Sequence, residues 1–381
     1  MTSRIDWVRS HCRLLTAIAK DFARTQPFRD LTIGTGIHLE PKTVALLLTL
    51  KDGGARVIST GNLNSTQPEA VEYLRANGVQ VIGDRTTDEG EHHQYLREVL
   101  RAQPNLILDN GGDLFVNYLE KPYEGLLGGT EETTSGRMRL ARLRSRLGRP
   151  ILVINDSPIK QFAENRHAVG QSVLESFLRI TNRATNGRNV VVFGYGSVGR
   201  GIAASFRNAY ATVSVIERDP VFRLEASFDG FLVPERGAGL KTAEIVITAT
   251  GAEGVVTEAD LDVLRDRVVL INAGHFPLEI AVERIGADPR VAKRQDGPDG
   301  VTTFVLTDGR AIHLLTEGHM VNLGGPRPLG NSIESMDLGF ALQARCLEAV
   351  ARGRTNPDDV VVPVPPSINA VVAQAFLELY R

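Results

Sequence analysis

The sequence has few of the features that mark secreted, membrane or nucleic-acid-binding proteins. Only two cysteines, Cys12 and Cys346, occur among 381 residues, which excludes a disulfide framework. No apolar run approaches the roughly 18 residues of a membrane span. The segment MTSRIDWVRSHCRLL lacks the apolar core of a secretory signal, and its periodicity predicts an ordinary helix. We therefore expect a cytoplasmic protein.

Charge and ligand patterns narrow the class of partner further. The formal net charge is only -2, so nothing favours nucleic acid or an anionic membrane as a partner. No cluster of Cys, His and carboxylate residues has metal-site spacing, and we expect no metal. The length of 381 residues exceeds one ordinary hydrophobic core and indicates two domains. The expected partner is a small molecule.

What the chain does contain is a glycine-rich stretch, Asn189-Val-Val-Val-Phe-Gly-Tyr-Gly-Ser-Val-Gly-Arg-Gly201. Its first residues predict a buried parallel strand, and a helical pattern follows at once. Gly194, Gly196 and Gly199 stand in G-x-G-x-x-G spacing. The first allows a tight turn, the second lets a pyrophosphate approach the backbone, and the third lets helix and strand pack closely. The stretch predicts a dinucleotide site.

An acidic residue follows at the expected distance. The next strand, Thr212 to Ile216, ends in Glu217, where a carboxylate accepts hydrogen bonds from a ribose diol. Glu217 favours NAD as cofactor, while Arg218 beside it leaves NADP as the alternative.

Strands and helices alternate on both sides of this stretch. Residues 1–160 form an α/β pattern of their own, and the pattern resumes to about residue 325. Ile5 to Phe22 predicts one amphipathic helix, and Asp308-Gly309 predicts a hairpin between Thr302–Leu306 and Arg310–Leu315. Ser335 to Arg352 and Ile368 to Tyr380 predict two final helices. The fold class expected is α/β, with two doubly wound parallel-sheet domains.

Several motifs together resemble the S-adenosylhomocysteine hydrolase family, in the family's order, over residues 30 to about 350. The matching segments are Gly36-Ile-His38 with Thr43, Asn64-Ser-Thr-Gln67, Ile107-Leu-Asp-Asn-Gly-Gly-Asp-Leu114, Glu131-Glu-Thr-Thr-Ser-Gly136, Ile154-Asn-Asp-Ser157 with Lys160 and Glu164-Asn165, Gly194 to Gly201, Asn272-Ala-Gly-His-Phe276 with Glu279, and Val321-Asn-Leu-Gly324.

The resemblance implies a domain plan and an assembly. Residues 1–165 and 328–381 would form a discontinuous substrate domain, and residues 166–327 a Rossmann NAD-binding domain. A homo-oligomer, dimer or tetramer, is expected. The family's C-terminal extension, which completes a neighbouring subunit's NAD site, has no counterpart before Arg381, so we expect NAD to be held without it.

The family's chemistry recycles a tightly held NAD. The substrate's ribose 3′ carbon is oxidised, the 4′ proton becomes acidic, and the 5′ substituent leaves by elimination. In the hydrolase, water then adds and the ketone is reduced again. The cofactor performs the redox step, while the protein supplies position, proton relays and dryness.

The resemblance implies roles for matching residues. Lys160 would manage the 3′-hydroxyl proton, and Glu132 and Glu164 would hold the 2′- and 3′-hydroxyls. His38 would lie near the 5′ leaving group and His275 beside the nicotinamide. The implied cofactor contacts are Thr133, Thr134, Ser135, Asn165, Gly194, Gly196, Ser197, Val198, Gly199, Glu217, Arg218, Thr248, Ala249, Thr250, Gly251 and Asn322.

Departures from the family gather at the substrate. Asn110 replaces an aspartate, and an amide cannot act as a base at neutral pH. Glu40 and Lys42 replace a threonine and a glutamate that read the adenine edge. Gly325-Pro-Arg-Pro-Leu-Gly330 replaces a histidine-containing closing loop, and Val169 a hinge cysteine. The expected substrate contacts are His38, Glu40, Gln67, Asn110, Glu132, Lys160 and Glu164.

These observations favour a nucleoside lyase that oxidises, eliminates and re-reduces, for example a dehydratase of specialised metabolism such as antibiotic biosynthesis. The alternative is an S-adenosylhomocysteine hydrolase of one-carbon metabolism. A plain dehydrogenase and a non-catalytic NAD-binding regulator also stay open, although Lys160 and His275 argue against the regulator.

Overall fold

A computed structural model describes residues 3–275 and 277–380 of the chain, so Phe276 of the predicted histidine motif lies outside the described residues. The chain divides into two compact units. Unit 1 comprises Met1–Gln161 and Ile333–Arg381, and unit 2 comprises Phe162–Ser332. The two units are described separately below.

Unit 1 is built on a seven-stranded sheet whose strand pairs are all parallel, in the order β14-β6-β5-β4-β1-β2-β3. The order reverses between β1 and β4, which is the switch point where such sheets bind ligands. Its strands are β1 (Thr32–Gly36), β2 (Arg56–Thr60), β3 (Gln80–Ile82), β4 (Leu106–Asp109), β5 (Gly128–Glu131), β6 (Ile151–Val153) and β14 (Val362–Pro363).

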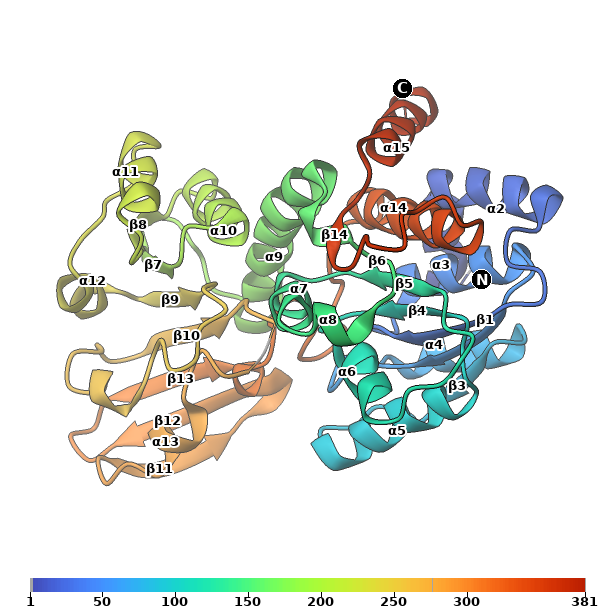
Figure 1. Ribbon diagram of the computed structural model, residues 1–381. Helices are drawn as coiled ribbons and strands as arrows, with labels where there is room; N and C mark the ends of the chain where they lie inside the picture. The colour runs from blue at the N-terminus through green and yellow to red at the C-terminus, as the bar shows by residue number, and fades with distance from the viewer. Residues whose placement is uncertain (1–2, 276, 381) are drawn as a thin grey trace. The chain divides into compact units, whose positions relative to one another are not determined.

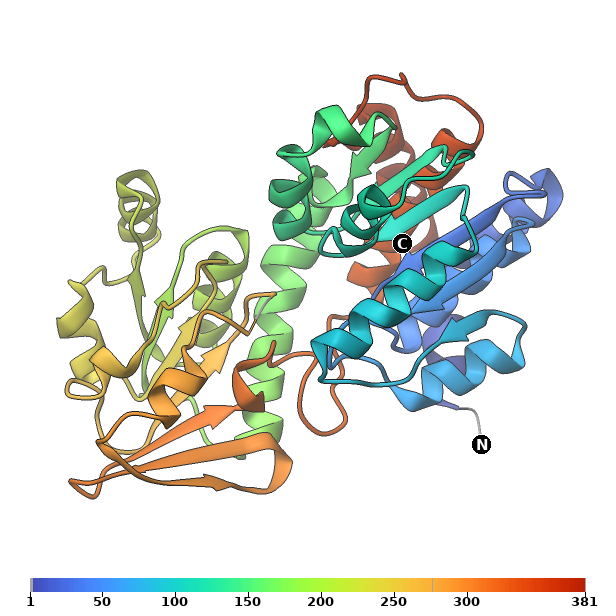
Figure 2. The ribbon, with the colours of Figure 1, turned by 60° about the horizontal axis from the view of Figure 1, so that its bottom comes forward.

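Helices cover both faces of this sheet (Figures 1 and 2). Helix α3 (Pro41–Asp52) is buried from Pro41 to Leu50, because α1, α2 and α14 pack against it in addition to strand β2. A helix apolar on all sides is typical of such a central position. The other helices are α1 (Arg4–His11), α2 (Arg13–Thr25), α4 (Pro68–Ala76), α5 (Glu89–Arg101), α6 (Asp113–Glu120), α7 (Thr134–Ala141), α8 (Arg144–Leu147), α14 (Ile333–Ala351) and α15 (Pro366–Leu379).

The predicted single helix from Ile5 to Phe22 is wrong, because the chain breaks at Cys12. Cys12 has φ -78° and ψ 76°, outside the helical region, and separates α1 from α2. The free N–H groups of Leu14 and Leu15 donate to the carboxylate of Asp337 at 2.7 and 2.9 Å. A carboxylate from distant α14 therefore satisfies the start of α2, a partner that local periodicity cannot show.

Unit 2 has a second seven-stranded sheet, in the order β11-β12-β13-β10-β9-β7-β8. The five neighbouring strands β13, β10, β9, β7 and β8 pair in parallel, while β12 lies antiparallel to both β13 and β11. The strands are β7 (Asn189–Phe193), β8 (Thr212–Ile216), β9 (Ile245–Thr248), β10 (Val268–Asn272), β11 (Val291–Asp296), β12 (Val301–Leu306) and β13 (Ala311–Leu315). The helices are α9 (Val169–Thr181), α10 (Ser197–Asn208), α11 (Pro220–Phe228), α12 (Arg236–Thr242) and α13 (Val282–Gly286), with a π-helix, η2 (Lys160–Ala168), before α9.

Strand β7 shows why this sheet is buried on both faces. Val190 and Val192 join an apolar cluster with α9 and α10, while Val191 and Phe193 join the cluster on the opposite face. Successive side chains of a strand point to opposite faces, so a central strand needs an unbroken apolar run. The run at Val190–Phe193 is therefore a central strand, with α10 directly after its glycine turn.

The α/β fold class is confirmed, and so is the hairpin around Asp308-Gly309, which joins β12 to β13. Several elements were not predicted individually, among them α6, β5, α7 and the edge strand β11. Among residues 3–275 and 277–380, no helix has the length and apolarity needed to cross a bilayer.

Candidate active site

A buried chain of hydrogen bonds crosses the carboxyl edge of the unit 1 sheet. Lys160 Nζ donates to Glu132 Oε1 at 2.9 Å, and the two side chains are only 5% and 6% exposed. Asn110 Nδ2 donates to Glu132 Oε2 at 3.0 Å, and Asn62 Nδ2 donates to Asn110 Oδ1 at 3.1 Å. The four residues follow β6, β5, β4 and β2. Parallel strands all end at this edge, which is how segments so distant in sequence come together.

The charge state of Glu132 follows from its partners. Burial alone would raise the pKa of this carboxyl, but the charge and hydrogen bond of Lys160 outweigh burial and lower the pKa below its usual value. His38 and Asn110 act in the same direction. Glu132 is therefore a carboxylate at neutral pH, able to accept a further hydrogen bond from a sugar hydroxyl.

His38 lies beside this chain, in the loop after β1. Its Nδ1 is 2.6 Å from Ser65 Oγ, and Ser65 Oγ in turn donates to the carbonyl of Asn62 at 3.1 Å. The Thr43 hydroxyl donates to the carbonyl of His38 at 2.6 Å. Both the ring and the backbone of His38 are thus oriented by neighbours. The structure brings together four predicted site residues, His38, Asn110, Glu132 and Lys160, and adds Asn62.

Two further carboxylates, Asp109 and Glu131, lie in the strands that precede Asn110 and Glu132. Asp109 and Glu131 are paired residues of β4 and β5, and both are fully buried. Burial raises the pKa of Asp109 to about 7, and burial together with Asp109 raises the pKa of Glu131 well above its usual value. Glu131 accepts from the backbone N–H groups of Gly111, Gly112 and Thr133 at 3.1, 2.9 and 2.7 Å. It fixes the loops that carry Asn110 and Glu132, and the sequence analysis assigned it no role.

The threonine-rich turn after Glu132 begins helix α7. Thr133 is its N-cap: the Thr133 hydroxyl accepts from the Gly136 N–H at 2.9 Å and donates to Glu131 Oε1 at 2.7 Å. Ser135 Oγ lies 3.1 Å from the Thr133 hydroxyl. Thr134 is the first residue of α7. These predicted cofactor residues therefore sit at a helix N-terminus, a position suited to an anionic group.

Two predicted residues, Glu164 and Asn165, lie in the π-helix η2. π-Helical turns are rare and occur frequently at functional sites. Glu164 is buried, and its Oε1 accepts from Asn331 Nδ2 at 3.4 Å, within unit 2. Asn165 is half-buried one position further on.

The glycine loop of unit 2 has the geometry that its spacing predicts. Gly194 has φ +93°, a backbone conformation that favours glycine. A Cβ at Gly199 would lie 2.0 Å from the Gly194 carbonyl oxygen, so only glycine allows α10 to pack here. A Cβ at Gly196 would meet nothing within 4 Å. Ser197 and Val198 begin α10 beside that open space.

Glu217 contacts the same loop. Its Oε2 accepts from the Tyr195 N–H at 2.7 Å, and its Oε1 accepts from the N–H groups of Arg218 and Asp219 at 2.6 and 3.0 Å. A carboxylate offers about four acceptor positions, so one stays available for a ribose hydroxyl. Glu217 therefore fixes the backbone of the glycine loop at Tyr195 and keeps an acceptor position for a ligand hydroxyl. Arg218 is exposed.

Buried Glu279 organises the opposite side of the loop. Its carboxylate accepts from the N–H groups of Thr250 and Gly251 at 2.9 and 2.8 Å and from the Thr250 hydroxyl at 2.7 Å. The carbonyl of Ala249 lies 2.6 Å from where a Cβ of Gly194 would stand. The predicted cofactor residues 249–251 thus lie directly against the glycine turn.

The remaining predicted residues lie at the carboxyl end of β9 (Thr248), after β10 (His275) and after β13 (Asn322). The Thr248 hydroxyl donates to Asn272 Oδ1 at 3.1 Å, and His275 lies three residues beyond Asn272, half-buried. Asn322 is buried, and its Nδ2 donates to Ser172 Oγ at 3.1 Å. Its Oδ1 is buried without a hydrogen-bond partner among the described residues.

Comparison with known proteins decides the family. Residues 165–327 match the model of the S-adenosyl-L-homocysteine hydrolase NAD binding domain, and residues 3–122 match the S-adenosyl-L-homocysteine hydrolase model. The chain is 40% identical to an adenosylhomocysteinase of Thermotoga maritima, over 98% of this chain and 93% of that protein. It is 38% identical to an S-inosyl-L-homocysteine hydrolase of Methanothermobacter thermautotrophicus, over 98% and 90%. The chain belongs to the S-adenosylhomocysteine hydrolase family.

A solved structure supports the fold alone. A protein of Ralstonia solanacearum described as a D-3-phosphoglycerate dehydrogenase superposes with a TM-score of 0.50 at 14% identity, covering 89% of this chain and 99% of that one.

As a member of the S-adenosylhomocysteine hydrolase family, the protein is an enzyme and its cofactor is NAD. The residues of unit 2 fit that cofactor. Gly196 leaves space where a pyrophosphate approaches the backbone, and Asn322 Oδ1 is a buried acceptor without a partner among the described residues. The carboxylate of Glu217 stands at the end of β8, where a ribose diol would bind.

The positions that depart from the hydrolase family are also ordered. Glu40 is the N-cap of α3, and its Oε2 lies 2.8 Å from Lys42 Nζ in an ion pair whose side chains are each 4% exposed. Gln67 is the N-cap of α4 and is half-buried. Val169 begins α9. In this chain a buried ion pair therefore stands where family members carry a threonine and a glutamate.

Proposed function

We propose that this enzyme acts on a nucleoside by oxidation at C3′, removal of the 4′ proton, elimination of the 5′ substituent and re-reduction, and that it works as a lyase releasing water. NAD supplies the two-electron redox capacity at the ribose 3′ carbon when it is bound. Every other task falls to side chains of the protein.

The observation that carries the proposal is the Lys160–Glu132–Asn110 arrangement. Lys160 Nζ, 2.9 Å from Glu132, would take the proton of a 3′-hydroxyl held by that carboxylate when its amine is in the neutral form. Glu132 orients the sugar diol through charge-assisted hydrogen bonds. Glu164, in the π-helix, would hold the second hydroxyl, and His275 would act near the oxidised carbon.

Asn110 supports the lyase over the hydrolase. Its amide is held by Glu132 on one side and by Asn62 on the other, and it carries no titratable proton. His38, oriented by Ser65, is then the titratable group for the 5′ side. It would protonate a departing 5′-hydroxyl, while no carboxylate stands at position 110 to activate water for addition.

The substrate base is expected to differ from that of a typical family member. One curated relative is an S-inosyl-L-homocysteine hydrolase, so the family accommodates more than one base. The buried Glu40–Lys42 pair and Gln67 would contact the base or the 5′ side of the substrate. A substrate domain over residues 1–165 and 328–381 and a dimer or tetramer complete the proposal.

The second candidate is an S-adenosylhomocysteine hydrolase, favoured by 40% identity to an adenosylhomocysteinase. One experiment separates the two. The purified enzyme is incubated in heavy water with S-adenosylhomocysteine or with 5′-hydroxy nucleosides, and the product masses are followed.

Loss of water with deuterium exchange at C4′ supports the lyase, and release of homocysteine supports the hydrolase. Net accumulation of NADH would indicate a plain dehydrogenase. If no substrate shows 4′ exchange, the oxidation–elimination mechanism is wrong.

A further inference from the structure

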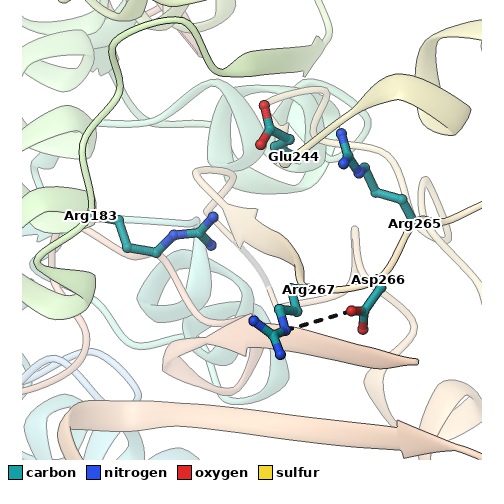
Figure 3. A pocket seen from close by; sticks show the side chains of 5 residues that line it. All are labelled: Arg183, Glu244, Arg265, Asp266 and Arg267. Atoms are coloured by element: carbon teal, nitrogen blue, oxygen red, sulfur yellow. Dashed lines mark ion pairs between the residues drawn. The ribbon is translucent and has the colours of Figure 1, made fainter. Parts of the chain in front are cut away.

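Unit 2 carries a charged pocket at the amino ends of its parallel strands, apart from the dinucleotide loop. Five residues line it: Arg183, Glu244, Arg265, Asp266 and Arg267 (Figure 3). Its volume is about 400 Å³, within the range of small-ligand sites. Glu244 directly precedes β9 and Arg267 directly precedes β10, whereas the glycine loop follows the carboxyl end of β7. A strand of this length spans roughly 13–16 Å, so the pocket is separate from the dinucleotide loop.

The two carboxylates of the pocket already have partners. Glu244 accepts from the Asn189 N–H at 3.1 Å and pairs with Arg188, outside the pocket lining, at 2.9 Å. Asp266 Oδ1 accepts from the Ala311 N–H at 2.8 Å. Glu244 shares its charge with Arg188, whereas Asp266 keeps its charge, so three guanidinium groups of the lining face two carboxylates.

Two of the three arginine side chains are available to bind a ligand. Within residues 3–275 and 277–380, the side chains of Arg183 and Arg265 make no hydrogen bond or ion pair, and Arg267 has only a 3.6 Å contact with Asp266, drawn in Figure 3. Three guanidinium groups therefore face one cavity with a surplus of positive charge. Planar, fork-shaped donors in this number suit the oxygens of a phosphate group.

The positive charge of the pocket changes the pKa of a neighbouring side chain, His313. Burial lowers the pKa of His313 on β13, and the charges of Arg183 and Arg267 lower it further. Glu244 responds in the complementary sense, since the charge of Arg265 is among the causes that lower its pKa. Asp266 raises the pKa of His313 in opposition, so these shifts locate Arg183 and Arg267 near His313 and Arg265 near Glu244.

The loop that carries Arg265 and Arg267 is anchored through its backbone. Arg267 has φ +59°, a conformation that an L residue adopts at a cost, and its N–H donates to the Ala311 carbonyl at 2.7 Å. The carboxylate of Asp266 accepts a hydrogen bond from the N–H of Ala311, the residue whose carbonyl binds Arg267. The backbone of this loop is therefore fixed, while the side chains of Arg267 and Asp266 are 79% and 52% exposed.

We propose that this pocket, which we call the arginine pocket, binds the phosphate group of a small phosphorylated molecule. The site lies away from the chemistry assigned to the enzyme and does not depend on the proposed function. Arg183 and Arg265 are its principal ligands, and Arg267 is the third.

Titration of the NAD-loaded enzyme tests the proposal. Inorganic phosphate, inorganic pyrophosphate and glycerol 3-phosphate are each titrated by calorimetry, because they distinguish a free anion from a diphosphate and a phosphomonoester. Saturating NAD removes the glycine loop as a competing site. We expect binding of at least one probe at one site per chain, weakened roughly tenfold or more by Arg183→Ala and by Arg265→Ala.

Controls keep the test decisive. Arg183→Lys should retain part of the affinity, because it keeps the charge and loses the fork. Arg223→Ala, an arginine of unit 2 that pairs with Glu235, should leave binding unchanged. Thermal unfolding and basal turnover without phosphate should match the unmodified enzyme in every variant. The proposal is overturned if no probe binds, or if binding survives in the Arg183→Ala/Arg265→Ala double variant.

Discussion

Nδ2 of Asn110 donates to Oε2 of Glu132 at 3.0 Å, so an uncharged amide stands against the carboxylate that we propose holds the sugar diol. In this position the amide adds a neutral hydrogen bond to Glu132, whose charged partner is Lys160. A carboxylate at position 110 would instead repel Glu132, and one of the two would retain a proton.

The first prediction concerns Asn110→Asp. The introduced carboxyl can replace the amide donor only when protonated, so turnover should fall at least tenfold as pH rises through its raised pKa. The measurement is the pH profile of kcat/KM for 5′-hydroxy nucleosides. Asn110→Gln serves as the uncharged control and should add no new ionisation. A profile that matches the unmodified enzyme would contradict the assigned contact.

The second prediction concerns Lys160→Ala. Removing the ammonium that lies 2.9 Å from Glu132 should slow oxidation by about 10²- to 10⁴-fold, while bound NAD is retained because the cofactor residues of unit 2 are unchanged. Single-turnover absorbance of reduced NAD, together with NAD content after denaturation, checks both halves. Turnover near the original rate would remove Lys160 from its role.

A matched pair of glycines separates cofactor binding from folding. An alanine Cβ at Gly196 meets nothing within 4 Å, so Gly196→Ala should leave the thermal midpoint unchanged but weaken NAD binding about tenfold or more. An alanine Cβ at Gly199 would stand 2.0 Å from the Gly194 carbonyl, so Gly199→Ala should cost about 1–3 kcal/mol of stability. Calorimetric unfolding with and without NAD measures both. Equal effects on stability from the two variants would refute the assignment.

The buried Glu40–Lys42 pair makes a prediction about stability. Lys42→Met leaves Glu40 as an unpaired buried charge and should cost about 3–5 kcal/mol. Glu40→Gln combined with Lys42→Met should recover much of that loss, because no charge is left unpaired. Urea unfolding of the single and double variants measures the difference. Additive losses would show that the pair is not coupled.

Asp109 makes a prediction about pH. Its pKa is about 7 in the folded protein, against an ordinary value of 3.8, so the folded state binds more protons between these values. The free energy of unfolding should therefore fall as pH rises from about 4 to 7, by a few kcal/mol. Asp109→Asn should flatten that slope relative to the unmodified protein. Urea unfolding at several pH values from 4 to 8 checks this, and parallel curves would contradict it.

Much of the site could be predicted from the sequence because its chemistry is local. The apolar run Val190–Phe193 with its glycines specifies a strand, a tight turn and a helix in consecutive residues, and the structure has them in that order. Asp308-Gly309 predicts its hairpin for the same reason. Glu132 and Lys160, by contrast, were identified through the family resemblance, because β5, which ends beside Glu132, was not predicted from the pattern.

What the sequence by itself determined was the α/β class, the dinucleotide loop and the family. Only the tertiary structure decided that Asn62, Asn110, Glu132 and Lys160 form one chain of contacts, that Asp337 divides the first helix, and that Glu279 braces Thr250 and Gly251. The physical reason is that each of these contacts joins residues from 22 to 323 positions apart. Periodicity and spacing describe neighbours along the chain, whereas parallel strands bring distant loops to one edge.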